Sequence, residues 1–173
     1  MKLFDYKLLV LSIIIVMLFS MAACRPFSDA DEAPWSVYEG EEFQFLYPEE
    51  WSEIETEVLP AGANVADNEV EEEMTAIFHV SVLEEREEEI TAEEFEDFQG
   101  RFVLVLGIDE LETINIDGRP GYIAYSVENN GYVYTYAFTY DDRSLYTFVY
   151  GGDEENYNPD LGTRIINYFE FKD

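Results

Sequence analysis

Hydrophobic and polar positions alternate along several stretches of the chain, which is the pattern of half-buried β-strands. In the first half this alternation predicts a hairpin over 36–38 and 42–46, a strand over 54–58 and a strand over 75–83. Residues 60–73 show little periodicity, so we expect a long connection there. The inward-facing side chains of the fourth strand are expected to be those of Ala76, Phe78, Val80 and Val82.

The second half of the chain predicts a meander of four strands. They are expected over 112–116, 122–128, 132–140 and 145–150. Asn, Asp and Gly adopt positive φ at low cost and therefore favour hairpin turns between such strands. The turns are expected at Asp117-Gly118, Asn129-Asn130-Gly131 and Asp141-Asp142-Arg143.

Two segments have helical spacing. Thr91 and Glu94 form a capping box, and Gly107 is placed to end the helix that follows. Asn158 and Pro159 begin a second helix, which we expect to end near Phe171. The apolar stripes are Phe95, Phe98, Phe102 and Leu106 in the first helix, and Leu161, Ile165 and Phe169 in the second. These elements predict an α+β fold, an antiparallel sheet meander with one inserted and one C-terminal helix packing on it as in a sandwich.

The strand expected over 132–140 has two different faces. Small side chains on one face suit a closely packed helix, and these are Val133, Thr135, Ala137 and Thr139. The other face carries Tyr132, Tyr134, Tyr136, Phe138 and Tyr140. In one interpretation these rings form ordinary cross-strand pairs with Tyr146, Phe148 and Tyr150. In the other, Tyr132, Tyr134, Tyr136 and Tyr140 form a half-wet face for a protein partner.

The first 23 residues have the pattern of a secretory leader. Lys2 and Lys7 precede 8–23, a run of 16 residues without charge that ends in small side chains. Met21-Ala22-Ala23-Cys24 resembles the lipobox of bacterial lipoproteins, although leucine is usual at the position of Met21. The alternative is an uncleaved membrane anchor, but a span needs about 20 residues.

The lipobox resemblance implies diacylglycerol on the Cys24 sulfur and cleavage before Cys24. Two acyl chains hold a protein stably at a membrane, so the chain is expected at the bacterial cell membrane, facing away from the cytoplasm. Cys24 is the only cysteine, and its acylation leaves none for a disulfide. We therefore expect a signal peptide over 1–23, a tether over 24–34 and a folded domain over 35–173.

The charge of the chain is strongly negative. From Cys24 onward, 38 acidic residues face seven basic ones. Such a surface excludes nucleic-acid binding, which depends on Lys and Arg neutralising phosphates. We expect the acidity to be an adaptation to a saline medium, because salt screens the self-repulsion. The alternative is a basic or metal-rich partner.

Side chains suited to catalysis are scarce. His79 is the single histidine, and its place in the middle of a strand predicts a structural role. The sequence has no Gly-x-Ser-x-Gly motif, and we interpret Gly118–Gly121 and Gly151-Gly152 as turns rather than phosphate loops. These observations favour a protein that is not an enzyme.

Clustered carboxylates offer oxygen ligands to calcium, but none has the spacing of a dedicated calcium loop. We therefore expect no confident metal site and no cofactor besides the lipid, with Ca²⁺ as the remaining candidate. A solvated acidic face is the simpler interpretation of these clusters. They are Glu71, Glu72 and Glu73, the run Glu84–Glu89, and Asp153, Glu154 and Glu155.

Three segments resemble the PsbP-like superfamily, in particular bacterial lipoproteins that carry a PsbP-like domain. They are Phe43–Trp51 (FQFLYPEEW), Thr113–Gly121 (TINIDGRPG) and Ile165–Phe171 (IINYFEF). The resemblance implies an antiparallel sheet between helices, and it says little about activity because fold does not fix function.

We expect a non-enzymatic, membrane-tethered binding or scaffolding module with an unknown protein partner. Its partner face would be the tyrosine face over 132–140 or the connection over 60–73. The alternative implied by the resemblance is a photosystem-type or cation-handling assembly factor. A hydrolase is the least favoured of the three possibilities, because no catalytic set can be assembled from the residues.

Overall fold

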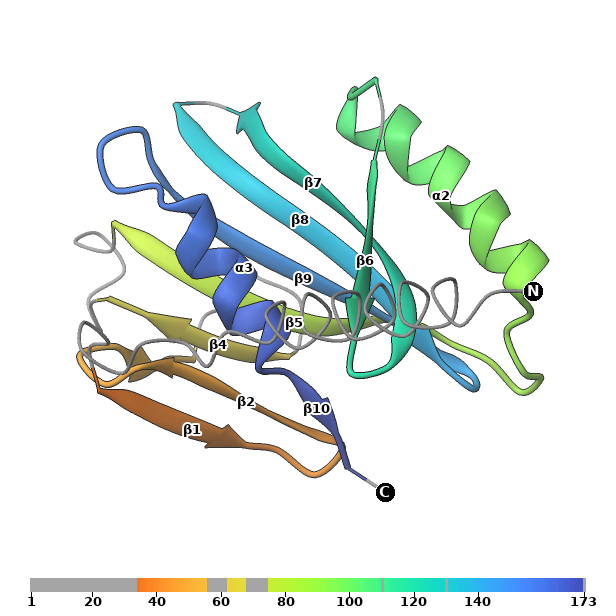
Figure 1. Cartoon of the computed structure of the whole chain (residues 1–173), viewed down its shortest axis with the longest axis horizontal. Coiled ribbons are helices and arrows are strands. Elements are labelled where there is room, and N and C mark those ends of the chain that lie inside the picture. Colours follow the sequence, from red (N-terminus) through yellow and green to blue (C-terminus); the bar gives the residue numbers. More distant parts are fainter. Residues whose placement is uncertain (1–33, 56–61, 68–74, 110, 130, 173) are drawn as a thin grey trace, which may run out of the picture. The chain divides into compact units, whose positions relative to one another are not determined.

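The computed structural model describes residues 34–55, 62–67, 75–109, 111–129 and 131–172. The predicted signal peptide and nearly all of the predicted tether therefore lie outside the described residues. Residues Pro34–Asp173 form one compact unit, which is α+β as expected (Figure 1). Its elements are β1 (Trp35–Glu39), β2 (Phe43–Pro48), β3 (Ser52–Glu53), β4 (Ala63–Ala66), β5 (Ala76–Glu85), α2 (Ala92–Leu106), β6 (Glu112–Ile116), β7 (Arg119–Asn129), β8 (Tyr132–Asp141), β9 (Ser144–Asp153), α3 (Pro159–Asn167) and β10 (Glu170–Phe171).

The strands form two antiparallel sheets. The small sheet has the order β1-β2-β10, and the large one has the order β3-β4-β5-β9-β8-β7-β6. The expected opening hairpin and the expected four-strand meander are both confirmed. Asp117 and Gly118 have φ values of 49° and 79°, the left-handed pair that a two-residue hairpin turn requires.

Helix α2 begins and ends where its local sequence predicts. The Thr91 hydroxyl accepts a hydrogen bond from the Glu94 amide, and the Glu94 carboxylate accepts one from the Thr91 amide. Gly107 ends the helix in the left-handed conformation, with φ of 67°. The stripe of α2 packs on β8, where Phe102 lies 4.4 Å from Phe138 between ring centroids.

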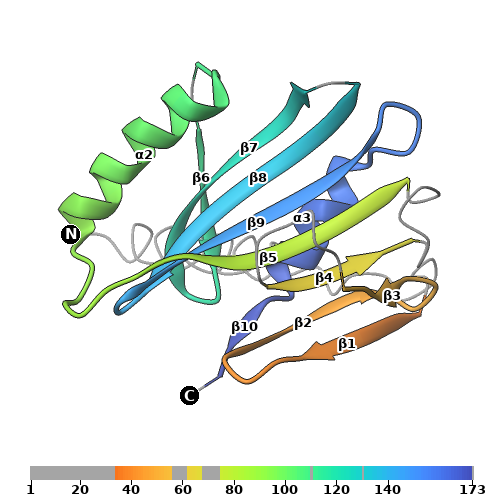
Figure 2. The same cartoon turned by 180° about the vertical axis from the view of Figure 1, so that it is seen from behind.

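Helix α3 and the small sheet cover the opposite face of the large sheet. Phe169, just after α3, lies 4.8 Å from Phe148 between ring centroids, and Phe45 of β2 lies 5.3 Å from Phe78 of β5. Ala137 belongs to this same buried cluster, so the small face of β8 does lie in a closely packed layer near a helix. Figure 1 shows α3 in front of β9 and β5, and Figure 2 shows it behind them.

Two strands differ from the sequence expectation in the first half of the chain. The expected connection over 60–73 contains β4, whose four residues are all buried and therefore show no alternation of apolar and polar side chains. The strand expected over 54–58 is not found at residues 54 and 55, and its other residues lie outside the described ones. A short strand, β3 (Ser52–Glu53), lies just before it.

Two further corrections concern the burial of one side chain and a helix end. Val82 lies opposite Tyr146, on the same face of β5 as Val80, but it is 38% exposed rather than buried. The last helix ends at Asn167 rather than near Phe171. The chain then turns and adds β10 to β2, with Glu170 opposite Gln44.

Candidate functional site

The tyrosines of β8 do not pair with Tyr146, Phe148 and Tyr150, so that prediction is wrong. Those three rings lie opposite Thr139, Ala137 and Thr135. The turn between β8 and β9 sets this register. Asp141 pairs with Ser144, so the turn has two residues instead of the expected three. A slip of one residue moves every side chain of a strand to the other face of the sheet.

Helix α2 covers part of the tyrosine face. Tyr140 lies 4.6 Å from Phe95 and Tyr136 lies 6.5 Å from Phe102, measured between ring centroids. Of the four tyrosines expected to form a partner face, these two therefore contact the helix. Tyr132 and Tyr134 form no ring contact with α2 in the described part of the chain, and Tyr132 is 47% exposed.

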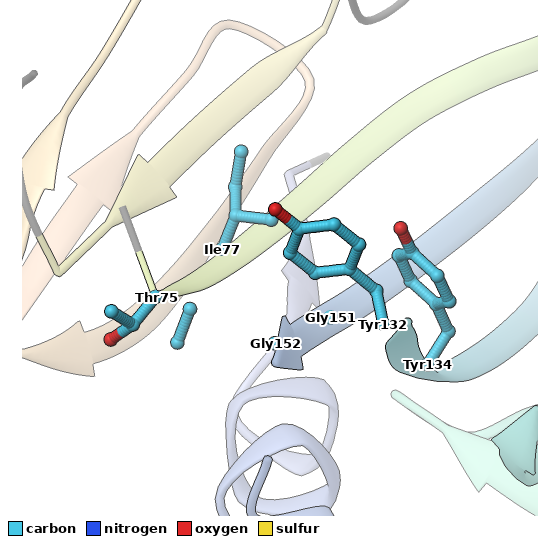
Figure 3. Close-up of a pocket in the computed structure, with 7 residues that line it drawn as sticks. Thr75, Ile77, Tyr132, Tyr134, Gly151 and Gly152 are labelled. Atoms are coloured by element: carbon cyan, nitrogen blue, oxygen red, sulfur yellow. The ribbon is translucent and has the colours of Figure 1, made fainter. Parts of the chain in front are cut away.

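Tyr132 and Tyr134 line a hollow of about 140 Å³ at one end of the large sheet. Their ring centroids are 6.4 Å apart and the ring planes are tilted by 42°. Figure 3 shows both hydroxyl groups pointing to the same side, with Ile77 next to the Tyr132 ring. The lining residues, which we call the tyrosine hollow, are Thr75, Ala76, Ile77, Tyr132, Tyr134, Gly151 and Gly152.

Two glycines of β9 allow neighbouring groups to approach the strand closely at the hollow. A Cβ on Gly151 would lie 2.5 Å from the Tyr134 ring, and one on Gly152 would lie 2.9 Å from the Thr75 carbonyl oxygen. The interpretation of Gly151-Gly152 as a turn is wrong, because both residues lie inside β9. Glycine within a strand pattern indicates close approach of a neighbouring group, and this signal could have located the hollow from sequence.

Carboxylates adjoin the tyrosine hollow. Asp67 accepts hydrogen bonds from both the amide and the hydroxyl of Thr75. Asp153 lies opposite Tyr132 in the β8–β9 register. Burial, and less strongly the neighbouring Tyr132, raises the pKa of Tyr134, so its hydroxyl stays protonated at neutral pH. The hollow is thus aromatic, uncharged on its walls and next to negative charge.

The structure brings no metal-binding group together among the residues it describes. The Asp153 carboxylate accepts hydrogen bonds from the amide and side chain of Asn156. Glu84 forms an ion pair with Arg86 rather than joining another carboxylate. The cluster of Glu71, Glu72 and Glu73 lies outside the described residues, and Ca²⁺ binding there stays a prediction.

His79 lies on β5 away from the tyrosine hollow. It is 2% exposed, and its Nδ1 donates to the Asn64 side-chain oxygen at 2.7 Å. Its Nε2 is buried without a hydrogen-bond partner in the part of the chain that the structure describes. Burial lowers the pKa of His79, which favours the neutral ring.

This burial predicts a pH-dependent loss of stability. Because the unfolded chain binds a proton near pH 6.5 and the folded chain resists it, the free energy of unfolding should fall as the pH drops below 6.5. The slope from this group is at most about 1.4 kcal/mol per pH unit. Urea denaturation between pH 7.5 and 5 should show a shallower fall in His79→Gln, which retains all carboxylates. Parallel curves for the two proteins would contradict the prediction.

Similarity to solved structures supports the PsbP-like fold. The solution structure of cyanobacterial PsbP (CyanoP) from Synechocystis sp. PCC 6803 superposes with a TM-score of 0.57 at 18% identity, covering 87% of this chain and 99% of that one. A crystal structure from Bacteroides thetaiotaomicron VPI-5482 has a TM-score of 0.57 at 11% identity, covering 83% of this chain and 50% of that one. No protein-family model and no curated protein sequence matches the chain.

The fold class is therefore the one that the sequence resemblance implied. In the described residues no helix is both long enough and apolar enough to span a membrane.

Proposed function

We propose that the chain is a lipid-anchored, non-enzymatic binding module that works on the outer side of a bacterial membrane. The tyrosine hollow is its contact for a protein partner. The observation that carries this proposal is the position of Tyr132, an aromatic ring left 47% exposed beside an open hollow. Tyrosine is enriched in protein interfaces because one end of its side chain is apolar and the other forms hydrogen bonds.

The size of the hollow favours a protein partner. Sites for small molecules typically enclose roughly 300–1,000 Å³, whereas the tyrosine hollow measures about 140 Å³. That volume suits one side chain that projects from a larger surface. The partner is then anchored at the hollow and contacts the surrounding sheet end.

The anchor is supported by the sequence before the domain. The uncharged run 8–23 and the lipobox-like Met21-Ala22-Ala23-Cys24 place an acylated cysteine about ten residues before β1. The acidic surface serves solubility in a saline medium and repels anionic lipid headgroups. A covalent lipid would hold the negatively charged domain near a membrane whose anionic headgroups repel it.

The proposal can be tested by site-specific photocrosslinking in membranes of the source bacterium. A photoreactive phenylalanine analogue is placed at Tyr132 in the full chain, and membrane and soluble fractions are probed for adducts. We expect a discrete protein adduct in the membrane fraction, lost when Tyr134→Ala is added. Labelling with a radioactive fatty acid should mark the parent chain and should not mark the variant Cys24→Ser.

Leu104 provides the matched control position. It is 81% exposed on α2 and does not line the tyrosine hollow, so a crosslinker there should not give the same adduct. Identical adducts from both positions, or none from Tyr132, would contradict a partner contact at the hollow. Absence of the fatty-acid label from the parent chain, or equal labelling of Cys24→Ser, would contradict the lipid anchor.

A further inference from the structure

We propose that the tyrosine hollow receives the guanidinium group of an arginine side chain from the protein partner. This inference rests on the proposed function and names the chemistry of the contact. A planar cation on the face of a tyrosine ring is attracted by the ring quadrupole, and arginine forms such contacts more often than lysine. The lining residues, the neighbouring carboxylates and the contact of Arg119 with Phe171 support this occupant.

The walls of the hollow suit a flat, partly apolar group. Tyr132 and Tyr134 offer ring faces, and the Ile77 side chain lies next to the Tyr132 ring (Figure 3). The flat guanidinium and the methylene stem of arginine match ring faces and an aliphatic wall, respectively. Gly151 on β9 lets the Tyr134 ring pack directly against the strand, because an added Cβ would lie 2.5 Å from that ring.

The charge beside the hollow selects a cation. Asp67 is bonded to Thr75 at one end of it, and Asp153 is the cross-strand neighbour of Tyr132. None of the described residues that line the hollow is Lys or Arg. An anionic side chain would therefore be repelled, whereas a cation gains from both the rings and the carboxylates.

The same fold already holds an arginine in this manner. The Arg119 guanidinium carbon lies 3.7 Å from the centroid of the Phe171 ring. Its nitrogens also form ion pairs with Asp117 at 3.5 Å and Asp141 at 2.8 Å. An aromatic face flanked by two carboxylates is thus satisfied here by an arginine within the chain. The tyrosine hollow likewise has aromatic rings with two carboxylates beside its lining, and none of its described lining residues is a cation.

The test uses the full chain in detergent micelles, with isoleucine methyl groups labelled for NMR. N-acetyl-arginine methylamide is the probe, and the citrulline compound, which has nearly the same shape and no charge, is its control. We expect a saturable shift of the Ile77 methyl signal with the arginine compound in the millimolar range, and a shift at least fivefold weaker with citrulline. The Ile116 methyl, fully buried on β6, should not move.

Variants distinguish the contributions to binding of the Tyr132 ring, of its hydroxyl group and of the nearby carboxylate. Tyr132→Leu removes the ring face and should weaken binding about tenfold, whereas Tyr132→Phe keeps the face and should change binding less than twofold. Asp153→Asn should weaken binding about threefold, and 1 M salt should weaken binding to the parent chain. The methyl spectrum of each variant shows whether the chain has kept its fold.

Two results would overturn the inference: equal binding of the citrulline compound, and unchanged affinity in Tyr132→Leu. Its failure is distinguishable from failure of the proposed function. If Tyr132 crosslinks a partner while the arginine compound does not bind, the module binds a partner through other chemistry. If the arginine compound binds while no crosslink forms, the proposed partner contact fails instead.

Discussion

Replacing Phe138 by alanine is expected to lower the free energy of unfolding by about 3–5 kcal/mol, the usual cost of deleting a buried phenylalanine ring. Phe138 is fully buried on β8. Rings of α2 surround it, with Phe95, Phe98 and Phe102 at centroid distances of 5.7, 5.4 and 4.4 Å. The cavity left by alanine would remain between two rigid elements and could not close without moving the helix.

The same variant should loosen α2 before the rest of the domain. Among the described residues, Phe138 is at the centre of the second buried cluster, through which α2 packs on the sheet. Urea denaturation measures the loss of stability, and amide hydrogen exchange should show faster opening within α2. Leu104→Ala on the same helix is the control, because Leu104 is 81% exposed and its truncation should change stability by less than about 0.5 kcal/mol. A loss below about 1 kcal/mol in Phe138→Ala would show that α2 is not anchored at this ring.

Gly162→Ala is expected to destabilise the domain by about 1–3 kcal/mol, although alanine is the better helix former. The added Cβ would lie 2.6 Å from Cδ1 and 2.7 Å from Cγ of Tyr150. Tyr150 cannot easily give way, because it is fully buried and its hydroxyl accepts a hydrogen bond from the Asn158 amide at 3.1 Å. Trp51 is stacked on the Tyr150 ring, with an angle of 12° between the planes. The steric cost therefore exceeds the gain of about 1 kcal/mol from helix propensity.

Gly100→Ala is the matched substitution with the opposite expected sign. Gly100 lies in the interior of α2, and nothing comes within 4 Å of an added Cβ. Only the propensity difference remains, so the variant should be more stable by about 0.5–1 kcal/mol. Thermal and urea denaturation of the two variants would check both signs. A stabilised Gly162→Ala would show that α3 can shift away from β9.

Features fixed by local chemistry could be predicted from the sequence. The capping box at Thr91 and the left-handed Gly107 set the ends of α2 within a few residues, so no tertiary information was required. The turn at Asp117-Gly118 likewise follows from its two residue types. The order of strands in the meander follows from such turns.

The remaining features depend on contacts between distant segments. Strand β4 is buried along its whole length, and the two-residue β10 exists only because β2 lies beside it. The pairing of β8 with β9 depends on one residue in the turn, which the composition of Asp141-Asp142-Arg143 does not decide. The sequence therefore indicates Tyr132 and Tyr134 as candidates but does not predict the hollow that they line.

The pairing of β10 with β2 has a consequence for the order in which the domain folds. The Gln44 side chain donates to the Glu170 carboxylate at 2.7 Å, and the Lys172 amide donates to the Glu42 carbonyl oxygen at 2.8 Å. These pairs join segments 126 or more positions apart in the sequence. Non-local pairing of this kind slows folding, because the loop must close before its contacts form. Because β10 follows every other element of the domain in the sequence, this edge of β2 stays unpaired until the segment after α3 is available.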